Sequence, residues 1–162
     1  LEEDMKSLSH CLAVMSIAAA ALIGSAAQAG PAATSPYYGR WVSSDGDRTF
    51  SARGRDYRTV DIAPCGNDFC GVSVGANGQC GPVLFRFLAK RANADDALRG
   101  HGKWGKDRKN VVIYYFDYEQ DQGGKQLELY LGKGYDFGER SDNMPSFHTI
   151  YAPKGKAVCK AR

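Results

Sequence analysis

A period-two alternation of apolar and polar side chains constrains this sequence most strongly, because it selects strands over helices. Residues 126–131 read Gln-Leu-Glu-Leu-Tyr-Leu, which predicts a strand with its leucines on one buried face. Over residues 111–118 a period of two places one set of side chains, mostly aromatic, on one face and a second set on the other: Val112, Tyr114, Phe116 and Tyr118 against Val111, Ile113, Tyr115 and Asp117. Neither segment shows the helical spacing of about 3.6 residues. The chain is therefore expected to fold mainly from strands.

Turn signals divide the rest of the chain into further short strands. These signals are Asp45-Gly46, Asn77-Gly78, Gln122-Gly123-Gly124 and Gly132-Lys133-Gly134. The expected strands are 38–42, 49–53, 57–63, 69–75, 147–151 and 157–160. Only residues 89–99 have a composition that suits a helix. Many short strands indicate an all-β domain, either a sandwich or a small closed antiparallel barrel, and aromatics on several strands favour the barrel.

The first thirty residues have the pattern of a secretory signal. A short basic start at Met5-Lys6 precedes an apolar run over 12–23, and Ala27-Gln28-Ala29 fits a cleavage site. We expect residues 1–29 to be a signal peptide, with residues 1–4 misassigned or non-native. A retained anchor is the alternative, but the apolar run is shorter than the about 20 residues that a span needs. The protein is then periplasmic or secreted, without a membrane span in its mature form.

The organisation after the signal is expected to be simple. Residues 30–36 are rich in small residues and proline and form a flexible leader. Residues 37–162 then form a single domain, since their number suits one ordinary core. The net charge is only +3, and no basic run alternates with aromatics. Nucleic acid is therefore not an expected partner.

Cysteine spacing supports export. Cys65, Cys70, Cys80 and Cys159 follow the signal, an even number that suits disulfides in an oxidising compartment. Of the possible pairings we favour Cys65–Cys70, which closes a tight turn, with Cys80–Cys159, which ties the C-terminal segment to the middle of the chain. A zinc site would need closely spaced Cys-x-x-Cys pairs, and a haem site Cys-x-x-Cys-His. We expect neither a metal nor a cofactor.

One motif suggests catalysis, and its context argues against it. Residues 71–75 match the Gly-x-Ser-x-Gly pattern of hydrolase nucleophiles, which requires a strand followed by a helix. Residues 76–82 are rich in glycine and proline and cannot begin a helix, so Ser73 is expected within a strand. His101 and His148 are expected at the surface or at a barrel rim. We therefore expect no enzymatic activity and assign no catalytic residue.

Two short motifs carry a family resemblance. Gly39-Arg40-Trp41 is similar to the Gly-x-Trp signature of lipocalins and their calycin relatives. Residues 60–71, Val-Asp-Ile-Ala-Pro-Cys-Gly-Asn-Asp-Phe-Cys-Gly, resemble a signature of small exported bacterial proteins of uncharacterised function with a lipocalin-like barrel. The resemblance covers residues 38–75. Two features of that family are missing here, a central Asp-Pro-x-x-Gly-x-x-Tyr stretch and a terminal Trp-x-Arg.

The resemblance implies a lipocalin-like antiparallel β-barrel of about eight strands. It also implies that Gly39 and Trp41 are structural, with Arg162 or Lys160 placed over the tryptophan ring as a cation–π partner. Lipocalin relatives bind small apolar or amphipathic molecules inside the barrel. By this resemblance the protein is a non-catalytic binder of such a molecule.

The residues expected to line a barrel cavity are the apolar ones on the clearest strands. They are Val60, Ile62, Val112, Tyr114, Phe116, Leu127, Leu129 and Leu131. The alternative for these residues is an ordinary packed core without a ligand space.

A second functional hypothesis is a protein–protein module, such as an inhibitor of an envelope enzyme. Lys103, Trp104, Lys106 and Arg108 lie in an expected loop over 103–110, where an aromatic among basic charges would suit an acidic partner. A packed barrel interior together with a protruding loop would favour this hypothesis over a ligand cavity. A solvated turn is the plainer interpretation of the same residues.

Overall fold

The computed structural model describes residues 34–45, 50–88, 97–119, 123–137 and 144–162, and these residues form strands and turns without a helix. The expected signal peptide and most of the leader lie outside them. No helix in these ranges is long and apolar enough to cross a membrane. The strands are β1 (Gly39–Ser43), β2 (Ser51–Ala52), β3 (Arg55–Asp56), β4 (Thr59–Cys65), β5 (Asp68–Val74), β6 (Cys80–Leu88), β7 (Leu98–Trp104), β8 (Asp107–Asp117), β9 (Lys125–Gly132) and β10 (Phe147–Gly155).

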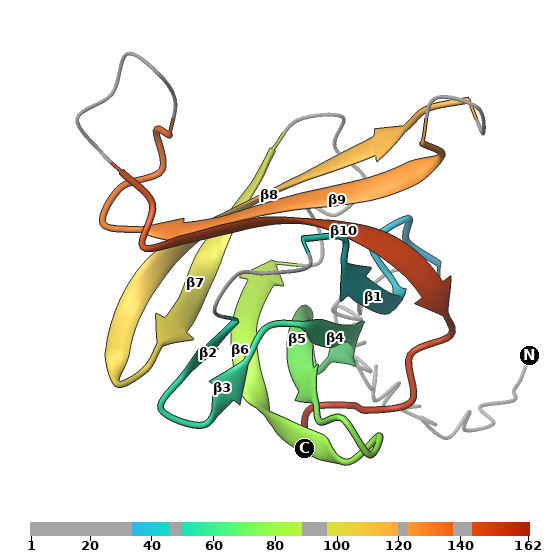
Figure 1. Ribbon diagram of the computed structural model, residues 1–162, viewed down its shortest axis with the longest axis horizontal. Coiled ribbons are helices and arrows are strands. Elements are labelled where there is room, and N and C mark those ends of the chain that lie inside the picture. Colours follow the sequence, from blue (N-terminus) through green and yellow to red (C-terminus); the bar gives the residue numbers. More distant parts are fainter. Residues whose placement is uncertain (1–33, 46–49, 89–96, 120–122, 138–143) are drawn as a thin grey trace, which may run out of the picture.

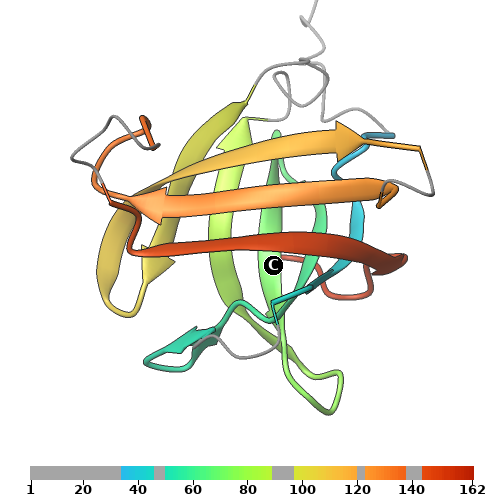
Figure 2. The same cartoon turned by 45° about the horizontal axis from the view of Figure 1, so that its top comes forward.

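Eight of the strands described here close into an antiparallel barrel, which confirms the predicted fold class. Around the barrel the order is β1-β10-β9-β8-β7-β6-β5-β4, and β4 pairs with β1 to close it. Each strand from β4 to β10 therefore pairs with the next one along the chain, as in an up-and-down barrel. The small hairpin β2–β3 lies at one end (Figure 1). Strands β8, β9 and β10 cross in front of β4, β5 and β6 (Figure 2).

Tight turns containing glycine join neighbouring strands. Gly66 has a φ of 65° in the turn between β4 and β5, where Cys65 pairs with Asp68. Gly105 has a φ of 62° at the first central position between β7 and β8. A positive φ at this position is what a two-residue type II′ hairpin turn requires, and glycine adopts it without a steric cost.

Inward-facing side chains fill the barrel with one apolar cluster. Leu127, Leu129 and Leu131 are fully buried, which confirms the predicted inner face of β9. Aromatic rings at both ends continue the cluster, with Phe69 stacked on Phe87 at a centroid distance of 5.2 Å. Such interdigitated side chains resemble an ordinary protein core.

Glycines on β5 and β7 make room for the phenylalanines of β6. A Cβ on Gly71 would lie 2.1 Å from the Phe85 ring, and one on Gly100 would lie 2.7 Å from the Phe87 ring. A Cβ on Gly102 would meet Val111 at 2.6 Å and the Leu84 carbonyl oxygen at 2.9 Å. The glycine-rich sequence of these strands therefore reflects close packing, since glycine within a strand often marks a close approach of another segment.

The sequence prediction missed β6 and β7 and misplaced one strand. Residues 157–160, expected as a final strand, form an irregular tail after β10. The helix-compatible segment 89–99 lies largely outside the described residues, and Leu98 and Arg99 belong to β7. The tail follows another course because its backbone binds a buried carboxylate instead of a neighbouring strand: the amides of Val158 and Cys159 donate to Asp61 at 2.8 and 2.7 Å.

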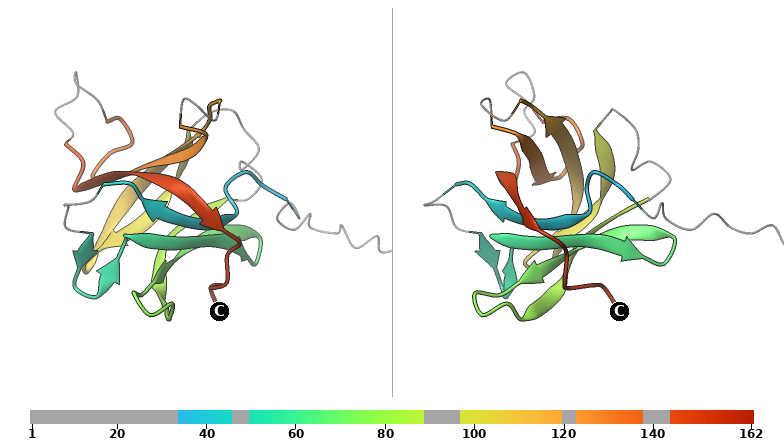
Figure 3. Two further views of the ribbon diagram at one scale, coloured as in Figure 1. Left: turned by 45° about the vertical axis from the view of Figure 1, so that its right-hand side comes forward. Right: turned by 90° about the vertical axis from the view of Figure 1, so that its right-hand side faces the viewer.

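Both favoured disulfides are present. Cys65–Cys70 bridges the β4–β5 hairpin, and Cys80–Cys159 ties the tail to the start of β6. Such bonds indicate an oxidising, extracytoplasmic environment. Figure 3 shows the tail, in dark red, ending beside the green strands.

Candidate functional site on the outer face of the barrel

The predicted cavity residues do not share one face of the barrel wall. Val60, Ile62 and the leucines of β9 belong to the interior cluster. Val112, Tyr114 and Phe116 lie on the opposite face of β8, because Val111, Ile113 and Tyr115 occupy the inner positions. The strand was correctly predicted, but its inner face was wrong. Both faces of β8 are apolar, so burial of either one is compatible with the sequence.

The outward residues of β8 form an aromatic strip with β9 and β10. Tyr118, which directly follows β8, Phe116 and Tyr114 are neighbours at centroid distances of 5.5 and 6.2 Å. Tyr114 then contacts Tyr130, whose ring stacks on His148 at 4.2 Å. These aromatics therefore pack mainly against one another on the outside of the barrel.

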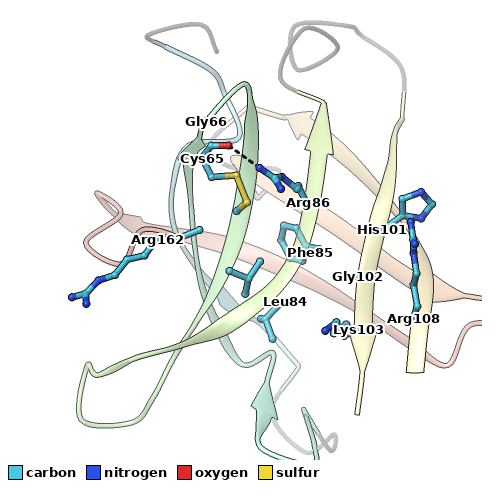
Figure 4. Close-up of a pocket in the computed structure, with 13 residues that line it drawn as sticks. Cys65, Gly66, Leu84, Phe85, Arg86, His101, Gly102, Lys103, Arg108 and Arg162 are labelled. Atoms are coloured by element: carbon cyan, nitrogen blue, oxygen red, sulfur yellow. Dashed lines mark hydrogen bonds between the residues drawn. A yellow bond between two sulfur atoms is a disulfide. The ribbon is translucent and has the colours of Figure 1, made fainter. Parts of the chain in front are cut away.

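A groove of about 560 Å³ lies on the outer face of β5, β6 and β7, next to the C-terminal tail. This volume is within the range of small-molecule sites. Its apolar part combines Val83, which is 40% exposed, with buried Leu84 and Phe85 beneath it. The Cys65–Cys70 disulfide adds to this part from the neighbouring hairpin (Figure 4).

The groove follows the junction of β6 and β7, which has the fewest paired positions among the described strands of the barrel. Strands β6 and β7 share two paired positions, Phe85 with Gly102 and Arg86 with His101, whereas β8 and β9 pair along eight. The buried Tyr57 hydroxyl supports this seam: it donates to the Lys103 carbonyl at 2.5 Å and lies 3.2 Å from the Leu84 carbonyl. Burial raises the pKa of Tyr57 well above its ordinary value, so the phenol remains a donor.

Basic side chains of β6, β7 and β8 line one side of the groove. They belong to Arg86, Lys103 and Arg108, with the imidazole of His101 among them. The Arg86 guanidinium is already bound, by Asp68 at 2.8 Å and by the Cys65 carbonyl at 3.2 Å. The remaining cations give this wall a positive charge beside an apolar floor. Such a combination can hold a molecule with one apolar and one negatively charged part.

The predicted interaction loop is a tight hairpin turn. Residues 103–110 belong to β7 and β8, apart from the turn at Gly105 and Lys106. Trp104 is half-buried and its ring stacks on Phe147 at 4.9 Å at the barrel end. The inward packing of Trp104 contradicts the predicted protruding loop, because this residue lies on the inner face of β7. Lys103 and Arg108 point outward instead and line the groove.

Trp41 is a structural residue, but its predicted cation–π partner is wrong. The ring is 2% exposed within the core, and its Nε1 donates to the Tyr37 carbonyl at 2.9 Å. Arg162 lines the groove, and its side chain points away from β6 and β7 (Figure 4). Within the described residues, cation–π contacts form only at Phe50 and Tyr135. The Asp61 carboxylate binds the tail beside β4, which explains why Arg162 does not lie over the Trp41 ring.

Gly39 has a φ of 152° on β1, where a Cβ would lie 3.0 Å from the Gly155 carbonyl oxygen.

The remaining motif residues have local structural roles. Ser73 is 3% exposed and its hydroxyl donates to the Asp56 carbonyl at 2.7 Å. His148 on β10 lies 2.8 Å from Glu128, which also accepts a bond from the Tyr130 hydroxyl at 2.6 Å. Within the described residues, no three acidic, histidine or cysteine side chains are grouped as metal ligands.

Sequence reasoning missed the groove because its parts come from distant segments. Val83 and Arg86 lie on β6, which carries Gly81 and Pro82 at its start and shows no clean alternation. The one usable signal is the basic cluster of residues 103–108, whose sequence alone suggests a loop. Only the closure of the barrel places that cluster beside β6.

No protein-family model matches the chain, and no curated protein or solved structure is significantly similar to it. The class is therefore defined by geometry alone: a disulfide-bonded, closed eight-stranded antiparallel barrel, compatible with calycin-like barrels, in the residues described. The resemblance to small exported bacterial barrel proteins stays a prediction.

Proposed function

We propose that this protein is an exported, non-catalytic binding protein for a small amphipathic molecule, which it holds in the outer groove. The observation that carries the proposal is the groove itself: it combines exposed Val83 with a basic wall. The barrel interior, by contrast, is occupied by side chains of the core cluster. Binding outside the barrel replaces the expectation of an interior cavity.

Two further observations support this proposal. The disulfides fit an exported protein that works in an oxidising compartment. They also stiffen the groove, because Cys65–Cys70 lies in its lining and Cys80–Cys159 fixes the tail whose end, Ala161 and Arg162, adjoins it. A preformed site loses less conformational entropy when its ligand binds.

Native mass spectrometry of the exported protein, recovered without denaturation, tests the proposal first. We expect an additional small-molecule mass, or uptake of decanol as a probe of the apolar part. The variant Val83→Gln should weaken decanol binding by about fivefold, because it removes exposed apolar area from the groove.

Leu88→Gln provides the matched control for that variant. Leu88 lies on the same strand, is 47% exposed and is not part of the groove. It should leave decanol binding unchanged. Equal effects of the two substitutions, or no decanol binding by the unmodified protein, would refute a ligand site in this groove.

A further inference from the structure

Two cations of the groove occupy paired positions on neighbouring strands, and their side chains extend in different directions in Figure 4. Lys103 on β7 pairs with Arg108 on β8, and both side chains are exposed on the outer face. Like charges in directly opposed positions destabilise an antiparallel sheet. In the described segments neither residue forms an ion pair, since the pairs found there join other residues. Two like charges therefore occupy opposed positions of the sheet, and no ion pair among the described residues offsets them.

We propose that Lys103 and Arg108 bind an acidic group of the groove's ligand, a carboxylate or a phosphate. This inference rests on the proposed function and adds the chemical class of the ligand: an anionic amphipathic molecule. An acidic group between the two cations would replace their repulsion with two charge-assisted contacts. Features that break a local rule of sheet design without compensation are expected at functional sites.

The distribution of charge along the groove supports one orientation of the ligand. Arg86 on β6 is engaged by Asp68, and Arg162, which also adjoins the groove, points away from β6 and β7 (Figure 4). Lys103 and Arg108, on β7 and β8, are then the cations available to a ligand lying over Leu84 and Phe85. The disulfide lies on the opposite side, with Phe85 and Leu84 between them (Figure 4). The acidic group would therefore bind at β7–β8, and the apolar part would extend toward β5.

The backbone on the cationic side is fixed before any ligand binds. The Lys103 carbonyl accepts the hydrogen bond from buried Tyr57, and the next residue, Trp104, stacks in the barrel end. The tight turn at Gly105 then sets the position of Arg108. Only the two side chains need to be ordered by the acidic group, which lowers the entropic cost of binding.

Isothermal titration calorimetry of the full chain with three probes tests this inference. Decyl phosphate contains both chemical parts, decanol only the apolar part, and inorganic phosphate only the acid. We expect decyl phosphate to bind at least about tenfold more tightly than decanol. In K103Q/R108Q this advantage should disappear, while decanol binding stays unchanged.

Lys106→Gln combined with Lys154→Gln is the matched control. Both lysines are exposed and outside the groove, so this variant loses the same charge elsewhere. It should keep the preference for decyl phosphate. An equal loss in the control would assign the preference to overall charge and overturn the inference.

The probes separate failure of the inference from failure of the proposed function. Equal affinity for decanol and decyl phosphate in the unmodified protein would overturn the acidic-group inference and leave an apolar groove. Inorganic phosphate binding as tightly as decyl phosphate would support the anion site but refute the amphipathic ligand. Binding of none of the probes would refute both.

Discussion

The Asp61 carboxylate accepts two hydrogen bonds from the Arg40 guanidinium, at 2.7 Å from Nε and 2.8 Å from Nη2. Asp61 lies on β4 and is fully buried, and Arg40 lies on the neighbouring strand β1, which closes the barrel. The same carboxylate accepts the backbone N–H groups of Val158 and Cys159. One buried charge thus fixes both the closing strand and the tail beside the groove.

This pair predicts a loss of stability in acid. Burial by itself would raise the pKa of Asp61, but Arg40 and the two tail amides hold it below its ordinary value of 3.8. The unfolded chain therefore binds the proton more readily than the folded one. Asp61 therefore makes its full contribution to the free energy of unfolding above its ordinary pKa. This contribution is lost as the pH falls through the lower pKa that Asp61 has in the folded protein.

Asp61→Asn tests this role by urea unfolding between pH 7 and pH 3. At neutral pH it should lower the free energy of unfolding by about 2–3 kcal/mol, since Arg40 loses its buried partner. It should also flatten the acid-side slope. Asp107, the exposed ion-pair partner of Lys109, provides the control. Asp107→Asn should change the free energy of unfolding by less than about 0.5 kcal/mol. A pH slope in Asp61→Asn as steep as that of the unmodified protein would contradict the assignment.

Tyr57→Phe is predicted to loosen the β6–β7 seam. It removes the hydroxyl that binds the Lys103 carbonyl and should destabilise the protein by about 1–2 kcal/mol. Hydrogen exchange should accelerate mainly at the amides of β6 and β7, which share few ladder bonds. Tyr118→Phe, at an exposed ring just after the end of β8, is the control and should alter neither quantity. Uniform acceleration over all strands would argue against a local role.

Gly102→Ala is predicted to disturb the same seam by steric overlap. Its Cβ would meet Val111 at 2.6 Å and the Leu84 carbonyl oxygen at 2.9 Å, so a strand must shift. We expect a loss of about 2–3 kcal/mol, measured by chemical unfolding. Gly75→Ala is the comparison, because its Cβ would approach no atom closer than 3.3 Å. Similar stabilities of the two variants would show that the barrel absorbs the extra methyl group.

The two disulfides should differ in their effect on stability. Cys80–Cys159 spans 79 residues, and replacing both cysteines with alanine should cost about 4 kcal/mol in the chain-entropy model. Cys65–Cys70 spans 5 residues, so its removal should cost less, about 2 kcal/mol. Thermal unfolding of the two double variants measures the difference. A larger loss of stability on removal of Cys65–Cys70 than of Cys80–Cys159 would indicate that the denatured chain is already compact around the tail, so that the long-range bond constrains it little.

The sequence predicts the buried face of a strand correctly where the two faces differ in polarity. The leucines of β9 alternate with Gln126, Glu128 and Tyr130, so only one face could be buried, and the structure confirms that face. On β8 both faces are apolar, so the prediction that placed Val112, Tyr114 and Phe116 inside was wrong, and Val111 and Ile113 occupy the interior. The preferred disulfides were predictable too, because one closes a short turn and the other anchors the tail.

The sequence by itself determined the all-β class and several strands, because these depend on local alternation. It favoured the cysteine pairs that the structure contains, and the family resemblance implied the structural role of Trp41. Tertiary structure decided the inner face of β8, the course of the tail and the outer groove. The groove combines Val83 on β6 with Lys103 and Arg108 from a later hairpin. Their proximity depends on barrel closure and on glycines that admit Phe85 and Phe87, and such long-range packing leaves no periodic signal in the chain.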